Sequence, residues 1–268
     1  MKKTLKMLIV VSLIFNMAGF AAAEPKIRDM VVEYDVQGTI MKGYLAYDEN
    51  INEKRPGVLV VHEWWGLNDY ARKRARMLAA LGYTALALDM YGEGKVAAHP
   101  ADAGKFSSAL MKNFDVGKAR FIGGMNVLIK QPTVDPTRIA AIGYCFGGGV
   151  VLNMARQSVD LKGVVSFHGG LSAVQPAQPG TVKTPILVLH GADDKFTTAK
   201  QIEDFKQEMV IAGADFRFIA YPGAIHSFTN PDADELGKKF NIPIGYNRVA
   251  DEQSWEELKN FLKKIFEK

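Results

Sequence analysis

The sequence contains only one cysteine, Cys145, in 268 residues. A single cysteine excludes an internal disulfide, so the stability of the fold must come from a hydrophobic core. Hydrophobic residues make up 48% of the chain, a composition typical of a globular protein with a full core. An unpaired thiol is a liability in an oxidising compartment unless it is buried or used, which favours a function for Cys145.

A strong excess of charge is also lacking. The formal net charge is +4, and it falls to +1 without the three lysines among the first six residues. The one remaining basic cluster, residues 72–74 with Arg76, lies on a predicted helix, where we expect a solvated face. Nothing in this pattern indicates nucleic-acid binding.

The sequence shows no metal-binding spacing and no phosphate loop. The five histidines are scattered, with no two at ligand spacing. They are His62, His99, His168, His190 and His226. The glycines after Cys145 are not followed by the Lys-Ser/Thr pair of a phosphate loop. We therefore expect no metal and no cofactor.

Long apolar runs are absent except near the start of the chain. Lys2, Lys3 and Lys6 precede a mostly apolar stretch over residues 7–20, which is short for a membrane span. Three alanines at 21–23 then supply the small residues of a cleavage site. We expect a secretory signal over residues 1–23, cleavage near Ala23, and a periplasmic or secreted protein without a stable membrane anchor.

Residues 24–268 are expected to form a single α/β domain. Two strands near the start read as an antiparallel hairpin, and strands then alternate with helices, which predicts a mostly parallel sheet covered on both faces. Val58–Val61 is continuously apolar, as in a strand buried on both sides. The predicted strands are 29–34, 38–47, 58–61, 84–88, 139–142, 161–167, 185–189 and 215–221. The predicted helices are 68–81, 102–129 with a break near 113–115, one starting after 145, 198–212, and a last one carrying Trp255 to Ile265. Residues 229–246 are expected to be a long polar loop.

The segment Gly143-Tyr144-Cys145-Phe146-Gly147 lies between a predicted strand and a predicted helix. This is the pattern of a nucleophile elbow with cysteine in place of serine. The turn is sharp, so the residues two before and two after the nucleophile must be small. At a helix N-terminus, the dipole favours a thiolate at Cys145. The alternative interpretation is a buried, inert cysteine.

A cysteine nucleophile needs a base, and the base needs an orienting acid. His226 follows the last strand, and two candidates for the acid, Asp193 and Asp194, follow the preceding strand. The order nucleophile, acid, histidine is that of α/β-hydrolases. His168 and His190 also end strands, where structural hydrogen bonding is their expected role.

Five motifs resemble those of the dienelactone hydrolase family of the α/β-hydrolases. They occur in the family's order and span nearly the whole chain after residue 61. They are 62–66 (His-Glu-Trp-Trp-Gly), 89–92 (Asp-Met-Tyr-Gly), 143–148 (Gly-Tyr-Cys-Phe-Gly-Gly), 190–196 (His-Gly-Ala-Asp-Asp-Lys-Phe) and 224–228 (Ala-Ile-His-Ser-Phe). The resemblance implies Cys145 as nucleophile, Asp194 as acid and His226 as base. Asp194 is preferred because the family's acid stands three residues after the glycine.

Elbow geometry predicts an oxyanion hole from the backbone N–H groups of Trp64 and Phe146. By resemblance, Glu63 contacts the resting thiol. Further candidates near the thiol or in the pocket are Trp65, Tyr91 and Ser227. Whether the two tryptophans belong to the pocket or to the core stays open, because aromatic residues dominate both.

The chain departs from the family where arginines hold the carboxylate of dienelactone. The corresponding regions carry Lys95 and Asn230, and lysine offers no bidentate fork. We therefore expect a more apolar pocket. The predicted function is hydrolysis of an ester, lactone or related acyl bond through an acyl-enzyme intermediate. The alternative is an exported non-hydrolytic ligand-binding or thiol-sensing protein with the same fold.

Overall fold

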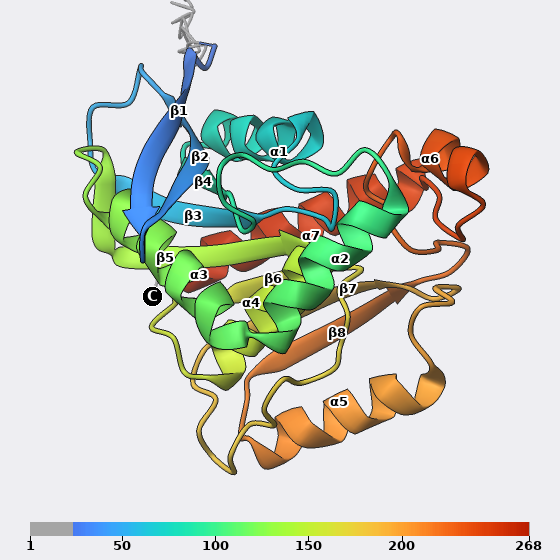
Figure 1. Cartoon of the computed structure of the whole chain (residues 1–268). Coiled ribbons are helices and arrows are strands. Elements are labelled where there is room, and N and C mark those ends of the chain that lie inside the picture. Colours follow the sequence, from blue (N-terminus) through green and yellow to red (C-terminus); the bar gives the residue numbers. More distant parts are fainter. Residues whose placement is uncertain (1–23, 268) are drawn as a thin grey trace, which may run out of the picture.

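The computed structural model describes residues 24–267, which form one eight-stranded sheet with helices on both faces (Figure 1). The strand order is β1-β2-β4-β3-β5-β6-β7-β8, with antiparallel pairing of β1 to β2 and of β2 to β4 and parallel pairing elsewhere. The strands are β1 Ile27–Val36, β2 Thr39–Asp48, β3 Arg55–Val61, β4 Thr84–Leu88, β5 Val134–Tyr144, β6 Val164–Phe167, β7 Ile186–Gly191 and β8 Phe216–Tyr221. The predicted mostly parallel sheet with an N-terminal hairpin is confirmed.

Residues 24–267 also form seven helices. Helices α1 and α7 cover one face, and α3, α4 and α5 cover the other (Figure 1). The helices are α1 Asp69–Ala80, α2 Pro100–Lys112, α3 Phe114–Ile129, α4 Phe146–Arg156, α5 Ala199–Ile211, α6 Ala233–Phe240 and α7 Arg248–Phe266. The predicted break near residues 113–115 is the junction of α2 and α3.

The apolar run in β3 packs against both helical layers. Leu59 and Val61 belong to the cluster under α3, α4 and α5, whereas Val58 and Val60 belong to the cluster under α1 and α7. Successive strand residues point to opposite faces, so this run fills two cores at once. All four side chains are fully buried, and the strand ends just before the predicted site.

Two predictions were wrong. Residues 229–246 contain a helix, α6, whose first and last turns are charged and whose C-cap Asn241 adopts a left-handed conformation. The basic cluster on α1 is not a uniform solvated face, because Arg74 is buried and paired with Asp251 of α7. The predicted signal at residues 1–23 lies outside the described residues. Within residues 24–267, no helix has the length and apolar character needed to span a membrane.

Candidate active site

Cys145 lies in the sharp turn between β5 and α4. Its backbone adopts φ 52° and ψ −115°, a strained conformation for a residue with a side chain. A Cβ on Gly143 would collide with the carbonyl oxygen of Gly147, and a Cβ on Gly147 would collide with that of Val61. The two flanking glycines are therefore required by the close approach of the backbone, as the elbow pattern predicts.

Hydrogen bonds donated by the backbone N–H groups of Cys145 and Gly147 hold the elbow. The N–H of Cys145 donates to the carbonyl oxygen of Phe167 at 3.0 Å and to Nδ1 of His168 at 3.1 Å. The N–H of Gly147 donates to the carbonyl oxygen of His62 at 3.1 Å. These bonds fix the start of α4, whose N-terminus faces the thiol.

His226 lies on the loop after β8 and pairs with Asp194. Its Nδ1 is 2.8 Å from Oδ2 of Asp194, whose side chain is fully buried. The other oxygen of Asp194 accepts the N–H of Phe196 at 2.8 Å. Asp193 is exposed and instead accepts the N–H of Gly223. Of the two carboxylates that the sequence left open, the structure thus places Asp194 against the imidazole.

The charges around His226 favour its protonated form. Burial alone would lower the pKa of this histidine, but negative charge on Cys145 and the hydrogen-bonded carboxylate of Asp194 together raise it to about 10. For Asp194, burial opposes ionisation, but the hydrogen bond from His226, the charge of His226 and the N–H of Phe196 together outweigh it and lower the pKa of the carboxyl. The electrostatics therefore favour a protonated His226 oriented by Asp194.

A cavity of about 370 Å³ opens onto Cys145 and His226. Its other lining residues are Trp64, Ser107, Ser108, Met111, Phe146, Gly149, Gly170, Ser172, Phe196 and Ile244. No lysine, arginine, aspartate or glutamate is among them. The cavity therefore presents apolar side chains and three hydroxyl groups to a bound molecule.

The N–H groups of Trp64 and Phe146 are suitable oxyanion donors. Both residues line the cavity beside Cys145. Phe146 is the first residue of α4, so its N–H has no acceptor within the helix. Neither N–H has a protein acceptor within residues 24–267. Both are therefore available to a ligand.

Glu63 is buried next to this cavity but does not contact the thiol. Its Oε2 accepts a 2.7 Å hydrogen bond from Asn230, and its Oε1 has no partner within the described chain. Burial raises the pKa of this carboxyl. The expected contact with Cys145 is thus replaced by one with Asn230, the residue that stands where the family has an arginine. Ser227, also buried, follows His226 in a left-handed turn with φ 59°.

The two tryptophans have different environments. Trp64 lines the cavity, whereas Trp65 is buried against Phe240 of α6, with ring centroids 6.0 Å apart. Tyr91 donates a 2.9 Å hydrogen bond to the carbonyl oxygen of Trp64, and its ring packs on that of Phe146 with centroids 5.6 Å apart. Trp65 and Tyr91 therefore support the cavity wall without lining it.

Asp89 and Lys95 do not line the cavity. Asp89 closes the loop after β4 by accepting the N–H groups of Tyr91, Gly92 and Gly94. Lys95 pairs with Glu93 at 2.8 Å and borders a separate cavity, so it does not take the place of the missing arginine.

Sequence reasoning missed the contribution of α2 to the cavity. Ser107, Ser108 and Met111 project from this helix, and Ile244 comes from the segment after α6. These residues lie far from the motifs along the chain, and their spacing carries no catalytic pattern.

The fold and the elbow define an α/β-hydrolase. The model of the dienelactone hydrolase family matches residues 41–266, and the chain belongs to that family. A dienelactone hydrolase-like promiscuous phosphotriesterase from metagenomic libraries is 33% identical, with a TM-score of 0.83 over 89% of this chain and 98% of that one. A solved structure titled m3DLH is 35% identical, with a TM-score of 0.84 and the same coverage. A candidate carboxymethylenebutenolidase of Saccharolobus solfataricus is 27% identical over 87% of this chain and 97% of that protein.

Proposed function

We propose that this dienelactone hydrolase-like enzyme cleaves uncharged esters or lactones through an acyl-enzyme on Cys145. The observation that carries the proposal is that His226 binds Asp194 through Nδ1 and lines the same cavity as the thiol of Cys145. Nucleophile, base and orienting acid are the parts that acyl transfer requires.

In the proposed mechanism, the thiolate of Cys145 attacks the carbonyl carbon and pushes its electron pair onto the carbonyl oxygen. The N–H groups of Trp64 and Phe146 stabilise that oxyanion. His226 then donates its Nε2 proton to the leaving oxygen as the carbon–oxygen bond breaks. In the second half, His226 takes a proton from water, the hydroxide attacks the thioester, and the thiolate leaves. Asp194 keeps Nδ1 of His226 protonated throughout.

The lining of the cavity supports an uncharged substrate. A carboxylate bound there would lose its hydration and meet no lysine or arginine, which is costly. Apolar contacts with Trp64, Met111 and Phe146 instead favour an alkyl or aryl acyl group.

The test compares 4-nitrophenyl butyrate with mono-4-nitrophenyl succinate, which adds a terminal carboxylate to a similar acyl chain. We expect kcat/KM for the neutral ester to be about 100-fold higher, because the carboxylate finds no partner. Met111→Arg places a cation in the cavity and is expected to narrow this ratio. Equal kcat/KM for the two esters would contradict the neutral-substrate assignment.

The nucleophile is tested separately. Cys145→Ala and prior alkylation with iodoacetamide are each expected to reduce kcat about 10³-fold or more. Unchanged turnover by Cys145→Ala would end the proposed mechanism. Folded wild-type protein that reacts with iodoacetamide but hydrolyses no ester, lactone or thioester would favour the binding or thiol-sensing alternative.

Uncharged phosphotriesters are a second candidate substrate class. The 33% identical relative is described as a promiscuous phosphotriesterase, and the cavity of this chain has apolar side chains that can receive a neutral aryl phosphotriester. Release of 4-nitrophenolate from paraoxon by wild-type protein, and its loss in Cys145→Ala, would support this activity. Absence of release would limit the enzyme to acyl substrates.

We also propose that the protein is exported and that residues 1–23 are removed. The basic start, the short apolar stretch and the alanines at 21–23 support this proposal. Mass spectrometry of the protein from fractionated cells is expected to find a mature N-terminus near Glu24 outside the cytoplasm. An intact Met1 in the cytoplasmic fraction would contradict it.

A further inference from the structure

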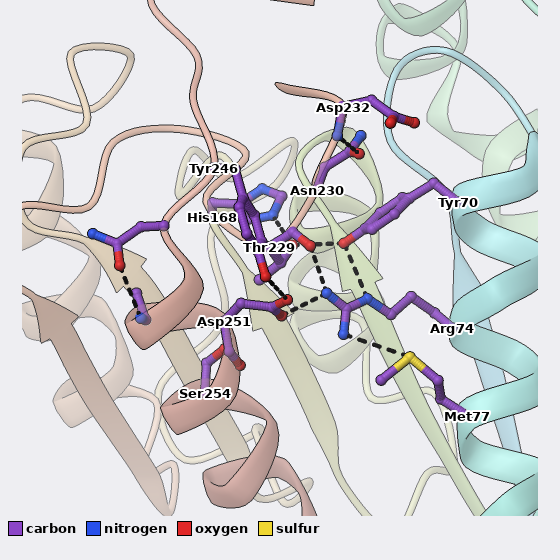
Figure 2. Close-up of polar contacts among 12 residues, drawn as sticks. Tyr70, Arg74, Met77, His168, Thr229, Asn230, Asp232, Tyr246, Asp251 and Ser254 are labelled. Carbon is purple, nitrogen blue, oxygen red and sulfur yellow. Dashed lines mark hydrogen bonds and ion pairs between the residues drawn. The ribbon is translucent and has the colours of Figure 1, made fainter. Parts of the chain in front are cut away.

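A chain of buried polar groups connects helices α1 and α7 to His168 (Figure 2). Asp251 of α7 accepts a 2.6 Å hydrogen bond from Arg74 of α1, and the same Nη2 atom donates to the carbonyl oxygen of Thr229 at 2.6 Å. The hydroxyl of Thr229 lies 2.7 Å from Nε2 of His168. Thr229 and His168 are both fully buried.

The hydrogen bonds of His168 define its tautomer. The N–H of Cys145 donates to Nδ1 at 3.1 Å, so Nδ1 carries no proton. The proton of a neutral imidazole then resides on Nε2, which donates it to the hydroxyl of Thr229. In the other tautomer, Nδ1–H would oppose the N–H of Cys145, and Nε2 would need a donor from Thr229.

His168 is also held in its neutral form. Burial, followed by the nearby positive charges of His226 and Arg74, lowers its pKa well below the ordinary range. A second proton would have to occupy Nδ1 and would break the contact with Cys145. The Nδ1 acceptor for the elbow N–H, which also donates to the carbonyl oxygen of Phe167, is therefore present throughout the neutral pH range.

The position of Thr229 joins the nucleophile to the base. Thr229 lies three residues after His226 on the same loop, and the rings of His168 and His226 pack edge to face with centroids 5.3 Å apart. His168 thus contacts the backbone of the nucleophile on one side and the base on the other. A displacement of its ring would alter the distance between the two reacting groups.

We propose that Thr229 is a positioning residue: by accepting the Nε2 proton, it stabilises the His168 tautomer that the N–H of Cys145 favours, and it thereby holds the ring of His168 between the backbone of Cys145 and the loop of His226. The proposal rests on the proposed function in taking Cys145 as the nucleophile and His226 as the base. Neither Thr229 nor His168 lines the cavity, so both act through other residues and not on the substrate.

The first experiment compares Thr229→Val with Thr229→Ser. Valine keeps the shape but removes the acceptor of the His168 proton, whereas serine retains the hydroxyl. The tautomer is read from the ¹⁵N chemical shifts of the two His168 ring nitrogens in histidine-labelled protein. We expect wild type and Thr229→Ser to show Nε2–H, and Thr229→Val to populate Nδ1–H. Thr229→Val should also reduce kcat about 10- to 100-fold with KM changed less than about threefold, because the loss is one of alignment.

Tyr70→Phe is the matched control for lost hydrogen bonding. Its hydroxyl lies 2.6 Å from the hydroxyl of Thr229, on the side away from His168. The variant therefore also removes a buried partner of Thr229 but leaves the His168 contact intact. We expect its His168 tautomer and its kcat to match those of wild type within about twofold. If Tyr70→Phe loses as much kcat as Thr229→Val, the loss in Thr229→Val reflects general destabilisation, and the proposal is overturned.

If Thr229→Val does not fold, a second pair of variants tests the proposal. His168→Asn also assigns the His168 signals, and its amide oxygen occupies the place of Nδ1 at a backbone φ of 39°, which asparagine tolerates. His168→Gln places its amide near Nε2 instead. We expect kcat of the Asn variant to exceed that of the Gln variant about tenfold or more. Equal values, or an unchanged tautomer in Thr229→Val, would refute the proposal. An active Cys145→Ala variant would refute the proposed function alone, because the tautomer is measured without turnover.

Discussion

Asp251→Asn is expected to destabilise the fold strongly because it leaves the buried charge of Arg74 unpaired (Figure 2). The side chains of Arg74 and Asp251 are 4% and 15% exposed, and their atoms approach to 2.6 Å. Removing one partner of a buried ion pair typically costs about 3–5 kcal/mol. Asparagine has nearly the same shape, so the substitution opens no cavity.

The remaining contacts of Arg74 place the effect at the lower end of that range. Its guanidinium still donates to the carbonyl oxygen of Thr229 and lies 5.3–5.4 Å from the ring centroids of Tyr70, Tyr144 and Trp255. Cation–π contacts of this kind contribute about 0.5–2 kcal/mol each. We therefore expect the free energy of unfolding to fall by about 3 kcal/mol, which corresponds to a Tm lower by about 6–12 °C for a domain of this size.

The assay is urea unfolding followed by tryptophan fluorescence, with the midpoint and the slope m compared between variants. Glu252→Gln is the control, because Glu252 lies next to Asp251 on α7 and pairs with Arg248 at the surface, where the side chains are 63% and 73% exposed. Its effect should stay within about 0.5 kcal/mol. A loss below about 1 kcal/mol for Asp251→Asn, or one equal to that of the control, would show that solvent screens the Arg74 pair.

Two further predictions concern the acid and the base. Asp194→Asn should reduce kcat about 10³- to 10⁴-fold, because the imidazole loses its orienting carboxylate. Asp193→Asn should change kcat less than about threefold. The reverse ranking in steady-state kinetics would identify Asp193, and not Asp194, as the acid. His226, with a pKa raised to about 10 from the ordinary 6.5, contributes stability that is fully present below pH 6.5 and is lost as the pH rises toward 10. Cys145→Ala removes the negative charge that is the largest cause raising this pKa, so an NMR titration of the imidazole should find a lower value in that variant and a flatter dependence of unfolding free energy between pH 6.5 and 10. The same pKa in both proteins would show that the thiol is uncharged in the resting enzyme.

Much of the fold was predictable because its signals are local. The apolar run in β3, the alternation of strands and helices, and the glycine-flanked elbow depend on neighbouring residues whose backbone preferences are independent of distant contacts. Helix α6 was missed because it has only eight residues, four of them charged, and buries only Ala233. Its stability comes from packing, including the contact of Phe240 with Trp65.

In the candidate site too, some features were predictable from the sequence and others were not. The chain order of Cys145, an aspartate and His226 could be read directly, but the choice between Asp193 and Asp194 needed the family resemblance, and the geometry then placed Asp194 against the imidazole. Nothing in the sequence predicted that Met111 of α2 would line the cavity.

The sequence by itself determined the parallel sheet, the strained turn at Cys145 and the order of the groups proposed for catalysis, because periodicity and glycine spacing act over a few residues. Only the tertiary structure decided which polar groups are buried together. The sequence places Arg74 in a basic cluster that is expected to be exposed. In the structure, Arg74 is buried and pairs with Asp251, which lies 177 residues further along the chain. The tautomer of His168 likewise follows from Cys145 and Thr229, which meet it only when the sheet is complete, because the burial and hydrogen bonding of a side chain depend on all the elements packed around it.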